Sequence, residues 1–200
     1  LVVLVGAGAG WARVRELRAP LRVVLIAPSR DFATSGLAPG EVRALGALVQ
    51  EQLEYQGGCT VTTVSRVPED LGFLRDVPRS WAVELIPRRQ GDALQLSYRA
   101  VRGQDIRAGQ ALPWRERTLD ALPPAQALQG FLRDFRKGRF FDVSHFVPAD
   151  PRLFWMLMRG SALRFQATQL EIAADLGTRV AQQEPSCVAA WVLLGTLHYQ

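Results

Sequence analysis

The sequence has few of the side chains on which most enzyme chemistry depends. It contains two cysteines and two histidines, with no CxxC pair and no cluster of cysteine and histidine. Zinc binding and thiol redox chemistry therefore have no support. Cys59 and Cys187 lie far apart in sequence, and either one disulfide or two buried thiols fits them. The serine nucleophile motif G-x-S-x-G is also absent.

Lysine is nearly absent as well. Lys137 is the single lysine, so 23 of the 24 basic residues are arginine, and the formal net charge is +5. The arginines are scattered along the chain and form no dense basic run. Nucleic-acid-binding surfaces gather their basic residues on one face or in one run. We therefore expect no direct contact with nucleic acid.

The composition that remains is that of a folded protein. The chain has 200 residues, of which 48% are apolar and 22% are charged, and no segment is of low complexity. A chain of this size and balance can bury a sizeable core and forms one or two domains. Intrinsic disorder is excluded as the general state of the chain.

Three alternating glycines follow the apolar run that opens the sequence, LVVLVGAGAG. A dinucleotide-binding loop has the pattern G-x-G-x-x-G after a strand. Gly6 and Gly8 fit its first two positions, and Gly10 comes one residue early for the third. The third position holds Trp11, whose indole opposes the close approach of helix and strand that the motif needs. We expect these glycines to bind no dinucleotide.

An alternative function remains open for this region. The strand LRVVLIA, residues 21–27, is followed by Arg30 where an acid would hold the ribose hydroxyls, although an arginine suits a 2′-phosphate. About the first 40 residues thus also resemble the nucleotide-binding unit of pyridine-nucleotide and flavin oxidoreductases. That resemblance implies a fragment of an NAD(P)- or FAD-dependent oxidoreductase using VVLVGAGAG as its nucleotide-binding loop.

The other interpretation makes residues 1–19 the end of a membrane anchor or a linker. Small residues are common in membrane-spanning helices, but a span needs about 20 residues, so residues 1–14 would be only the end of one. Positive residues favour the cytoplasmic side of a membrane. Arginines directly after the anchor therefore oppose the simplest topology, in which the soluble part that follows lies outside the cytoplasm. The positive residues that follow the run are Arg13, Arg15, Arg18 and Arg22.

Hydrophobic periodicity predicts a mixed-sheet α/β domain over residues 20–137. Short β-branched runs and period-two alternation indicate strands, and apolar residues at helical spacing indicate helices. In residues 93–102, for example, Leu94, Leu96 and Tyr98 alternate with polar residues, as in a half-exposed antiparallel strand. The predicted strands are residues 21–27, 60–65, 80–87, 93–102 and a segment between 106 and 118. The predicted helices are residues 40–55 and 123–136, with a short helix or turn at 68–74.

Residues 138–150 are a connection, and residues 151–200 are predicted to be an all-helical, tetratricopeptide-like region. The opening of that repeat, W-x2-L-G-x2-Y, is matched at Trp191, Leu194 and Gly195. Gly160 lies 35 residues before Gly195, against a repeat of 34 residues. A generic helical hairpin is the alternative interpretation. Further matching positions are Ala173, Ala174, Pro185, His198 and Tyr199.

Taken together, residues 20–200 resemble a known arrangement. The segments LRVVLIAPS, GEVRALGALVQEQLEYQ, CTVTTVSR and WAVELIPRRQGDALQLSYRAVR are similar to the TolB amino-terminal domain and the flagellar FlgO protein, and tetratricopeptide-like helices follow. Such modules occur in CadC-type membrane-anchored regulators, in some adenylate cyclases and in some bacterial Ser/Thr kinases. The resemblance implies a module without enzymatic activity. The Asn/Gly-rich loop usual after the first strand in that family is missing.

The resemblance implies a function and a location. We expect a non-catalytic sensor and protein-interaction module of a membrane-anchored bacterial signalling or transcription-regulatory protein, with the soluble part periplasmic or extracytoplasmic. We expect a protein partner to bind through the helical repeats. Tetratricopeptide units need stacked neighbours, so we also expect further helices after residue 200. Side chains of the last helix would stay partly uncovered unless further repeats, the α/β domain or a second protein packs on them. These side chains are Leu193, Leu194 and Leu197.

No catalytic, cofactor-binding or metal-binding residue is assigned. His145 and His198 are isolated histidines, Ser35 lies outside a nucleophile motif, and acidic residues in turns are explained by capping. Aromatic residues of the helical region fit a helix core better than a cofactor site. The acidic residues considered are Asp31, Glu69, Asp70 and Asp105, and the aromatic stretch comprises Phe154, Trp155, Leu157 and Phe165.

Overall fold

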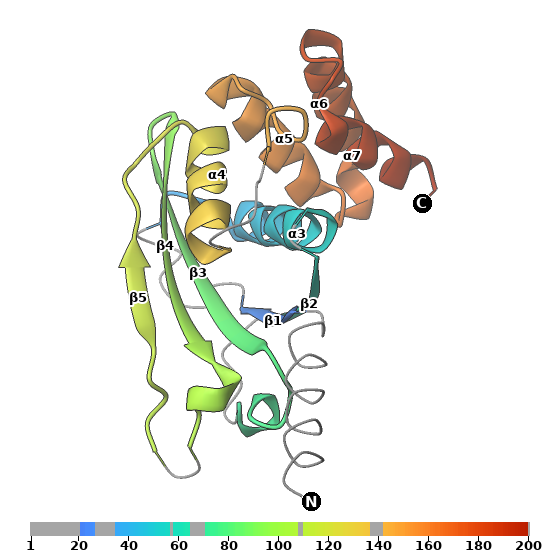
Figure 1. Cartoon of the computed structure of the whole chain (residues 1–200). Helices are drawn as coiled ribbons and strands as arrows, with labels where there is room; N and C mark the ends of the chain where they lie inside the picture. The colour runs from blue at the N-terminus through green and yellow to red at the C-terminus, as the bar shows by residue number, and fades with distance from the viewer. Residues whose placement is uncertain are drawn as a thin grey trace, which may run out of the picture.

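The protein has the mixed-sheet α/β fold expected, followed by a helical region (Figure 1). The computed structural model describes residues 21–26, 35–56, 58–64, 71–107, 110–136 and 142–199. The strands are β1 (Leu21–Ile26), β2 (Cys59–Val64), β3 (Ser80–Gln90), β4 (Ala93–Arg102) and β5 (Arg115–Thr118). The α-helices are α3 (Pro39–Tyr55), α4 (Pro124–Phe135), α5 (Pro151–Leu163), α6 (Leu170–Gln183) and α7 (Val188–His198). The described residues also form short 3-10 helices at η1 (Gly72–Leu74), η2 (Gly103–Asp105) and η3 (Ala167–Gln169).

The sheet has the strand order β2-β1-β3-β4-β5. Strand β1 pairs in parallel with both β2 and β3, whereas β3, β4 and β5 form an antiparallel meander. The hairpin between β3 and β4 turns at Gly91, whose φ of 62° lies in the left-handed region that favours glycine. Strand β3 runs to Gln90, three residues beyond the predicted end, because it pairs with β4 as far as Gln90↔Ala93. Among the described residues of the predicted range 106–118, only Arg115–Thr118 is strand.

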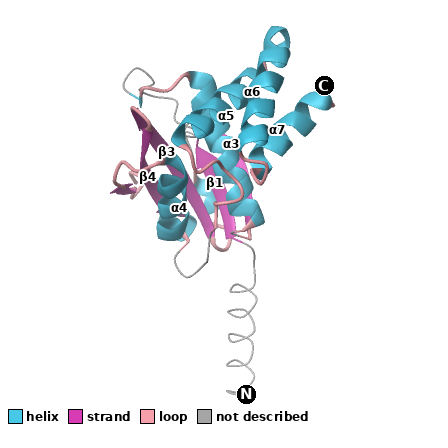
Figure 2. Ribbon diagram, turned by 90° about the horizontal axis from the view of Figure 1, so that it is seen from above, coloured by secondary structure: helices cyan, strands magenta, loops and turns pink. Residues whose placement is uncertain are grey.

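The side chains of β4 alternate between buried and half-buried, as predicted for a half-exposed antiparallel strand. Leu94, Leu96 and Tyr98 are buried, and the intervening Gln95, Ser97 and Arg99 are half-buried. The buried set faces α3 and α4, which cover the same side of the sheet (Figure 2). A smaller apolar cluster lies on the opposite face. It contains Val24, Ile26, Leu71, Leu74, Ala82, Val101 and Ile106.

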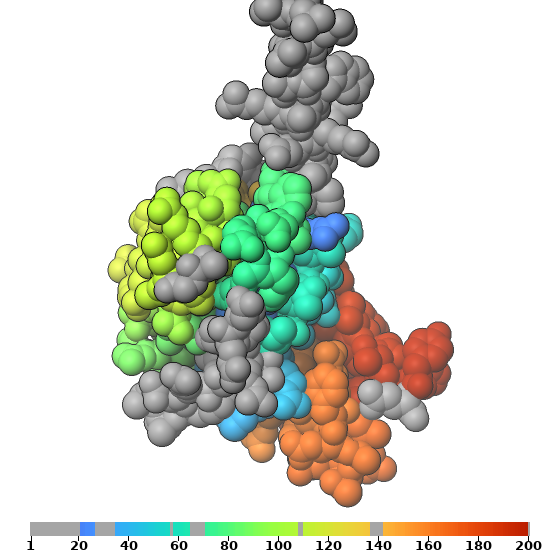
Figure 3. Space-filling view, turned by 90° about the horizontal axis from the view of Figure 1, so that it is seen from below, coloured from blue at the N-terminus to red at the C-terminus, as the bar shows by residue number. Residues whose placement is uncertain are grey.

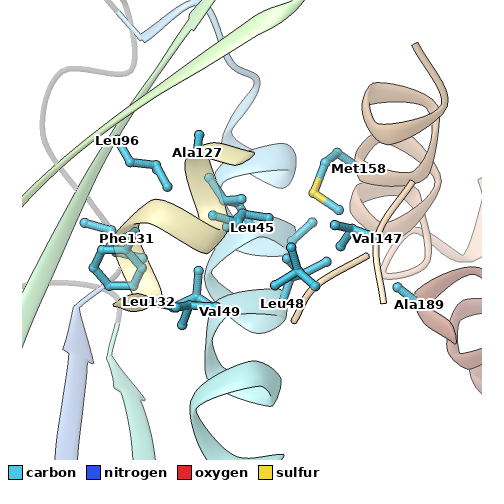
Figure 4. Close-up of a cluster of buried hydrophobic side chains, with 14 of the residues drawn as sticks. Leu45, Leu48, Val49, Leu96, Ala127, Phe131, Leu132, Val147, Met158 and Ala189 are labelled. Atoms are coloured by element: carbon cyan, nitrogen blue, oxygen red, sulfur yellow. The ribbon is translucent and has the colours of Figure 1, made fainter. Parts of the chain in front are cut away.

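The main core continues from the sheet into the helical region without a break. Leu45, Leu48 and Val49 of α3 stand between α4 on one side and the helical region on the other (Figure 4). Figure 4 shows Phe131 and Leu132 of α4 on the first side, and Met158 of α5 and Ala189 of α7 on the second. Helix α3 thus lies between the sheet and α5, and α6 and α7 pack in turn on α5.

Local sequence signals explain where the two central helices begin. Pro39 stands at the first turn of α3, where a missing N–H costs nothing, and the Glu41 carboxylate accepts a hydrogen bond from the Ala38 N–H at 2.9 Å. Helix α5 also has a proline, Pro151, in its first turn, but here the N-cap side chain itself is the acceptor: Asp150 accepts from the Arg152 N–H at 2.8 Å. Among the residues described, no helix is both long enough and apolar enough to cross a bilayer.

A buried glutamine in α3 provides a prediction about stability. Gln52 is 1% exposed, and neither its side-chain nitrogen nor its oxygen has a hydrogen-bond partner. A buried amide without partners carries a desolvation penalty of about 1–3 kcal/mol. We expect Gln52→Met, which keeps the volume and removes the polar atoms, to raise the free energy of unfolding by about 1–2 kcal/mol. Denaturant unfolding measures it, and Gln126→Met, at an exposed site in α4, is the control expected to change little.

Candidate functional site: the outer face of helix α7

The glycines of the opening segment lie outside the described residues. The same holds for Trp11, for Arg30 and for Asp31. The interpretation of Gly6, Gly8 and Gly10 as a failed dinucleotide motif, and that of residues 1–19 as the end of a membrane anchor, therefore remain sequence-based predictions.

The histidines do not meet in a site. His145 offers its backbone carbonyl oxygen to the Val188 N–H at 2.9 Å, and so helps to position the start of α7. His198 lies in the last turn of α7, exposed, with its ring 5.9 Å from that of Tyr199. Within the described ranges, no three residues of the histidine, cysteine, aspartate or glutamate type are grouped as metal ligands would be.

Both cysteines are buried, and neither forms a disulfide. Cys59 begins β2, and Cys187 precedes α7, with its Sγ 3.5 Å from the Phe146 carbonyl oxygen. Burial raises the pKa of the Cys187 thiol, which keeps it protonated and unreactive. Of the two alternatives open from the sequence, the structure has two thiols and no disulfide.

The remaining polar candidates have structural roles. The Ser35 hydroxyl accepts from the Leu37 N–H at 3.2 Å in the turn before α3. Asp105 lies 3.9 Å from Arg115 in an exposed ion pair. Glu69 and Asp70 fall outside the described residues.

The aromatic stretch of α5 is core, with one exception. Phe154 and Trp155 are buried, and the Trp155 indole donates to the Asp92 carbonyl oxygen at 3.2 Å, which ties α5 to the β3–β4 turn. Leu157 is also buried, but Phe165 is 55% exposed just after α5 ends. The interpretation of a helix core is therefore correct for the first three residues and wrong for Phe165.

Helix α7 is apolar on two opposite sides, and only one of them is covered. Its inner side carries Ala189, Ala190 and Leu193, which are 8%, 0% and 1% exposed. The Leu193 side chain fits against two glycines, because a Cβ built on Gly160 of α5 or on Gly177 of α6 would lie only 3.1 or 3.3 Å from its Cδ2. The cover that the sequence analysis requires for Leu193 is thus supplied by α5 and α6 of the same chain. Leu194 and Leu197 are partly buried against the main core.

The outer side of α7 bears a stripe of exposed apolar residues. Val188, Trp191 and Val192 are 44%, 55% and 40% exposed, and Tyr199, just beyond the helix, is 91% exposed. With Gly195 these residues recur every three or four positions and so share one face of the helix. We call this set, Val188, Trp191, Val192, Gly195 and Tyr199, the α7 outer stripe. Helices α6 and α7 project from the side of the molecule in Figure 3 (red).

The centre of the α7 outer stripe is shaped for close approach. A Cβ on Gly195 would meet no atom within 4 Å, so the backbone of α7 is open there. Gly160, which holds the corresponding place in α5, is covered by both α6 and α7. Its Cβ would lie 3.3 Å from the Ala173 carbonyl oxygen and the Leu176 Cβ of α6, and 3.1 Å from the Leu193 Cδ2 of α7. Gly195 is thus the exposed counterpart of a glycine that a neighbouring helix covers.

Trp191 is held in place although its ring is exposed. Its indole N–H donates to the Pro185 carbonyl oxygen at 2.8 Å, across the turn between α6 and α7. A fixed aromatic ring loses little conformational entropy when a partner covers it, which is one reason why tryptophan contributes strongly to interfaces. Trp191, Leu194 and Gly195 were singled out from the sequence; Val188 and Val192 were not.

The chain matches no family model, and no curated protein matches its sequence.

Proposed function

We propose that this chain is a non-catalytic sensor and protein-interaction module of a membrane-anchored bacterial signalling or transcription-regulatory protein. The α7 outer stripe binds a helix of a partner protein. The observation that carries the proposal is the row of exposed apolar residues on a helix whose opposite side is buried in the core. Contiguous exposed apolar residues of this kind are characteristic of interaction sites.

The internal geometry of the helical region supports a helix as the occupant. Helix α6 covers the Gly160 side of α5, and the same side of α7, centred on Gly195, is uncovered. A partner helix that packs on Gly195 would repeat the contact that α5 and α6 already make. Val188 and Trp191 would lie on one side of that contact and Tyr199 on the other, along the i, i+3, i+4 spacing typical of helix docking.

The resemblance to membrane-anchored regulators supplies the rest of the proposed arrangement. The apolar residues 1–14 serve as the end of a membrane anchor, and the soluble part lies outside the cytoplasm. In this arrangement the α/β domain and the helical region form one body through α3, so a change in the α/β domain reaches α7 through packed side chains. The output, catalytic or DNA-binding, belongs to another part of the parent protein.

Site-specific photo-crosslinking in the native host tests the proposed interaction. A benzoylphenylalanine placed at position 192, on the α7 outer stripe, is expected to form an adduct with one other protein. The same group at position 175, an exposed site on α6, is expected to form none. The added Trp191→Ala change should reduce the yield at 192 strongly, because removal of a central tryptophan weakens an interface about thirtyfold.

A matched variant controls for general loss of apolar surface. Phe165 has the same exposed fraction as Trp191, 55%, but lies at the end of α5, away from the stripe. Phe165→Ala should leave the adduct at 192 unchanged. Equal adducts from positions 192 and 175, or an adduct that contains only this chain, would contradict a partner protein on the α7 outer stripe.

A further inference from the structure

An arginine-lined pocket opens on the α/β domain, far along the chain from α7. It lies between the end of α4 and strands β4 and β5, and its volume is about 340 Å³. A second hollow of about 270 Å³ adjoins it at the start of β3. The two share Trp81 and Arg102. This edge of the molecule, around residues 71–107, faces the viewer in Figure 3 (green).

One wall of the pocket is aromatic. The edge of Trp81 meets the ring of Phe135, with centroids 5.6 Å apart, and Phe135 stacks on the buried Phe131 at 5.9 Å. Tyr98 closes the wall, with its ring 6.4 Å from that of Phe135. These contacts hold the rings rigidly, so the wall is formed before any ligand arrives.

The rim of the pocket is strongly positive. Arg102, Arg115, Arg117 and Arg136 line it, against the single carboxylate of Asp134. That carboxylate accepts a hydrogen bond from the Tyr98 hydroxyl at 2.6 Å. Burial and Asp134 raise the pKa of Tyr98, so the hydroxyl stays protonated and continues to donate.

Two of these arginines carry uncompensated charge. Arg102 and Arg117 form no ion pair within the described part of the chain. The Arg102 guanidinium lies over the Trp81 ring at 4.9 Å. A guanidinium stacked in this way keeps its N–H donors pointing outward in its own plane, where they can bind an oxyanion with two parallel hydrogen bonds.

The adjoining hollow contains a strained residue. Arg79 has a φ of 54°, in the left-handed region that a side chain rarely adopts, and its carbonyl oxygen accepts from the Arg22 N–H at 3.1 Å. Glycine would occupy this position without strain. Residues held in such conformations cluster at binding sites. Arg75 lines the same hollow, but it forms an ion pair with Asp76 at 3.7 Å, so its charge is partly compensated.

We propose that this pocket binds a small organic anion that combines an aromatic ring with a carboxylate or phosphate group. The aromatic wall takes the ring, and Arg102 and Arg117 hold the anionic group. A volume of about 340 Å³ is at the small end of ligand pockets, which suits one ring and one anionic group. In the proposed function, this pocket would be the part that senses a signal. Binding of the anion does not depend on that function; only the use of the bound anion as a signal rests on it.

Titration of the isotopically labelled protein, followed through the indole N–H resonance of Trp81, tests the site. The probes are phenyl phosphate, benzoate, inorganic phosphate and phenol. We expect saturable shifts with phenyl phosphate or benzoate, and the tighter of the two identifies the anionic group. Inorganic phosphate should bind more weakly because it lacks the ring. Phenol, which lacks the charge, should produce no saturable shift.

Arginine variants separate a specific site from general positive charge. Arg102→Gln and Arg117→Gln should each weaken binding of the better probe about tenfold, since each removes a charge-assisted hydrogen bond. Arg88→Gln removes the same charge from an exposed site on β3 outside the pocket and should leave binding unchanged. The proposal is overturned if no probe saturates the Trp81 shift by about 20 mM, if phenol binds as well as the anions, or if Arg88→Gln weakens binding as much as Arg102→Gln. The titration needs no partner protein, so its failure leaves the α7 interaction standing, and failure of crosslinking leaves this site standing.

Discussion

Replacement of Gly103 by alanine lowers the free energy of unfolding by about 3 kcal/mol, the largest loss that we expect from the addition of one methyl group to this protein. Gly103 begins η2, at the end of β4, and it is buried. A Cβ there would overlap the Ser80 hydroxyl oxygen and the Leu74 backbone carbonyl.

Neither of those groups can move aside cheaply. The Ser80 hydroxyl donates to the Leu74 carbonyl oxygen at 2.6 Å, and the same oxygen accepts from the Val77 N–H at 3.2 Å. An added methyl group must break this buried network or shift η1 away from the sheet. Either change leaves polar groups unpaired, which adds to the cost of overpacking.

Thermal unfolding measures the effect. A loss of about 3 kcal/mol corresponds to a fall of roughly 6–12 °C in Tm for a chain of this size. Gly130→Ala is the control, because a Cβ at this position of α4 meets no atom within 4 Å. It should stabilise the protein by about 0.5–1 kcal/mol through helix propensity. If Gly103→Ala unfolds at the wild-type temperature, as the control should at least do, then η1, β3 and η2 do not pack closely around Gly103.

Truncation of Leu193 to alanine has the second largest expected effect, again a loss of about 3 kcal/mol. Leu193 is 1% exposed and fills the space between Gly160 and Gly177. The two glycines offer no side chain that could move into the vacated volume. The surroundings therefore collapse little, and the cavity penalty remains close to its full size.

The neighbouring residue supplies the matched comparison. Val192 is 40% exposed and points to the other side of α7. Val192→Ala should change the free energy of unfolding by less than about 0.5 kcal/mol, since it leaves no cavity and alanine favours the helix. Denaturant unfolding of both variants measures the difference. Equal losses from the two would mean that α7 is not packed with Leu193 inward and Val192 outward.

The sheet and the helices were predictable because their patterns are local. Period-two alternation over residues 93–102 places β4 correctly, and helical spacing in residues 40–55 places α3 within one residue of its start. The length of β3 was not predictable, since it depends on the partner strand: Arg88, Arg89 and Gln90 are polar but pair with β4.

The two candidate binding surfaces were harder to predict. Helix α7 is apolar on all sides, so periodicity could not tell that Leu193 lies inside and Val188 and Val192 outside. For the same reason the sequence did not indicate that α5 and α6 themselves cover Leu193. The pocket was missed because Trp81, Tyr98 and Arg117 come from three strands and meet only when the meander folds. Scattered arginines in the sequence carried no sign that they converge.

The proposed function depends most on one claim, that a partner covers the α7 outer stripe in the cell. Oxidative labelling by hydroxyl radicals measures this directly, because the reaction of an aromatic ring follows its exposure to solvent. In the purified protein, Trp191 and Tyr55 should both label, being 55% and 86% exposed, and Trp155, at 6%, should not.

The decisive measurement repeats the labelling in intact host cells. If a partner helix occupies the stripe, labelling of Trp191 falls severalfold while that of Tyr55, which lies at the end of α3, stays at the level of the purified protein. If Trp191 labels in cells as strongly as in the purified protein, relative to Tyr55, the stripe is bare where the protein works, and its role as a docking surface is contradicted.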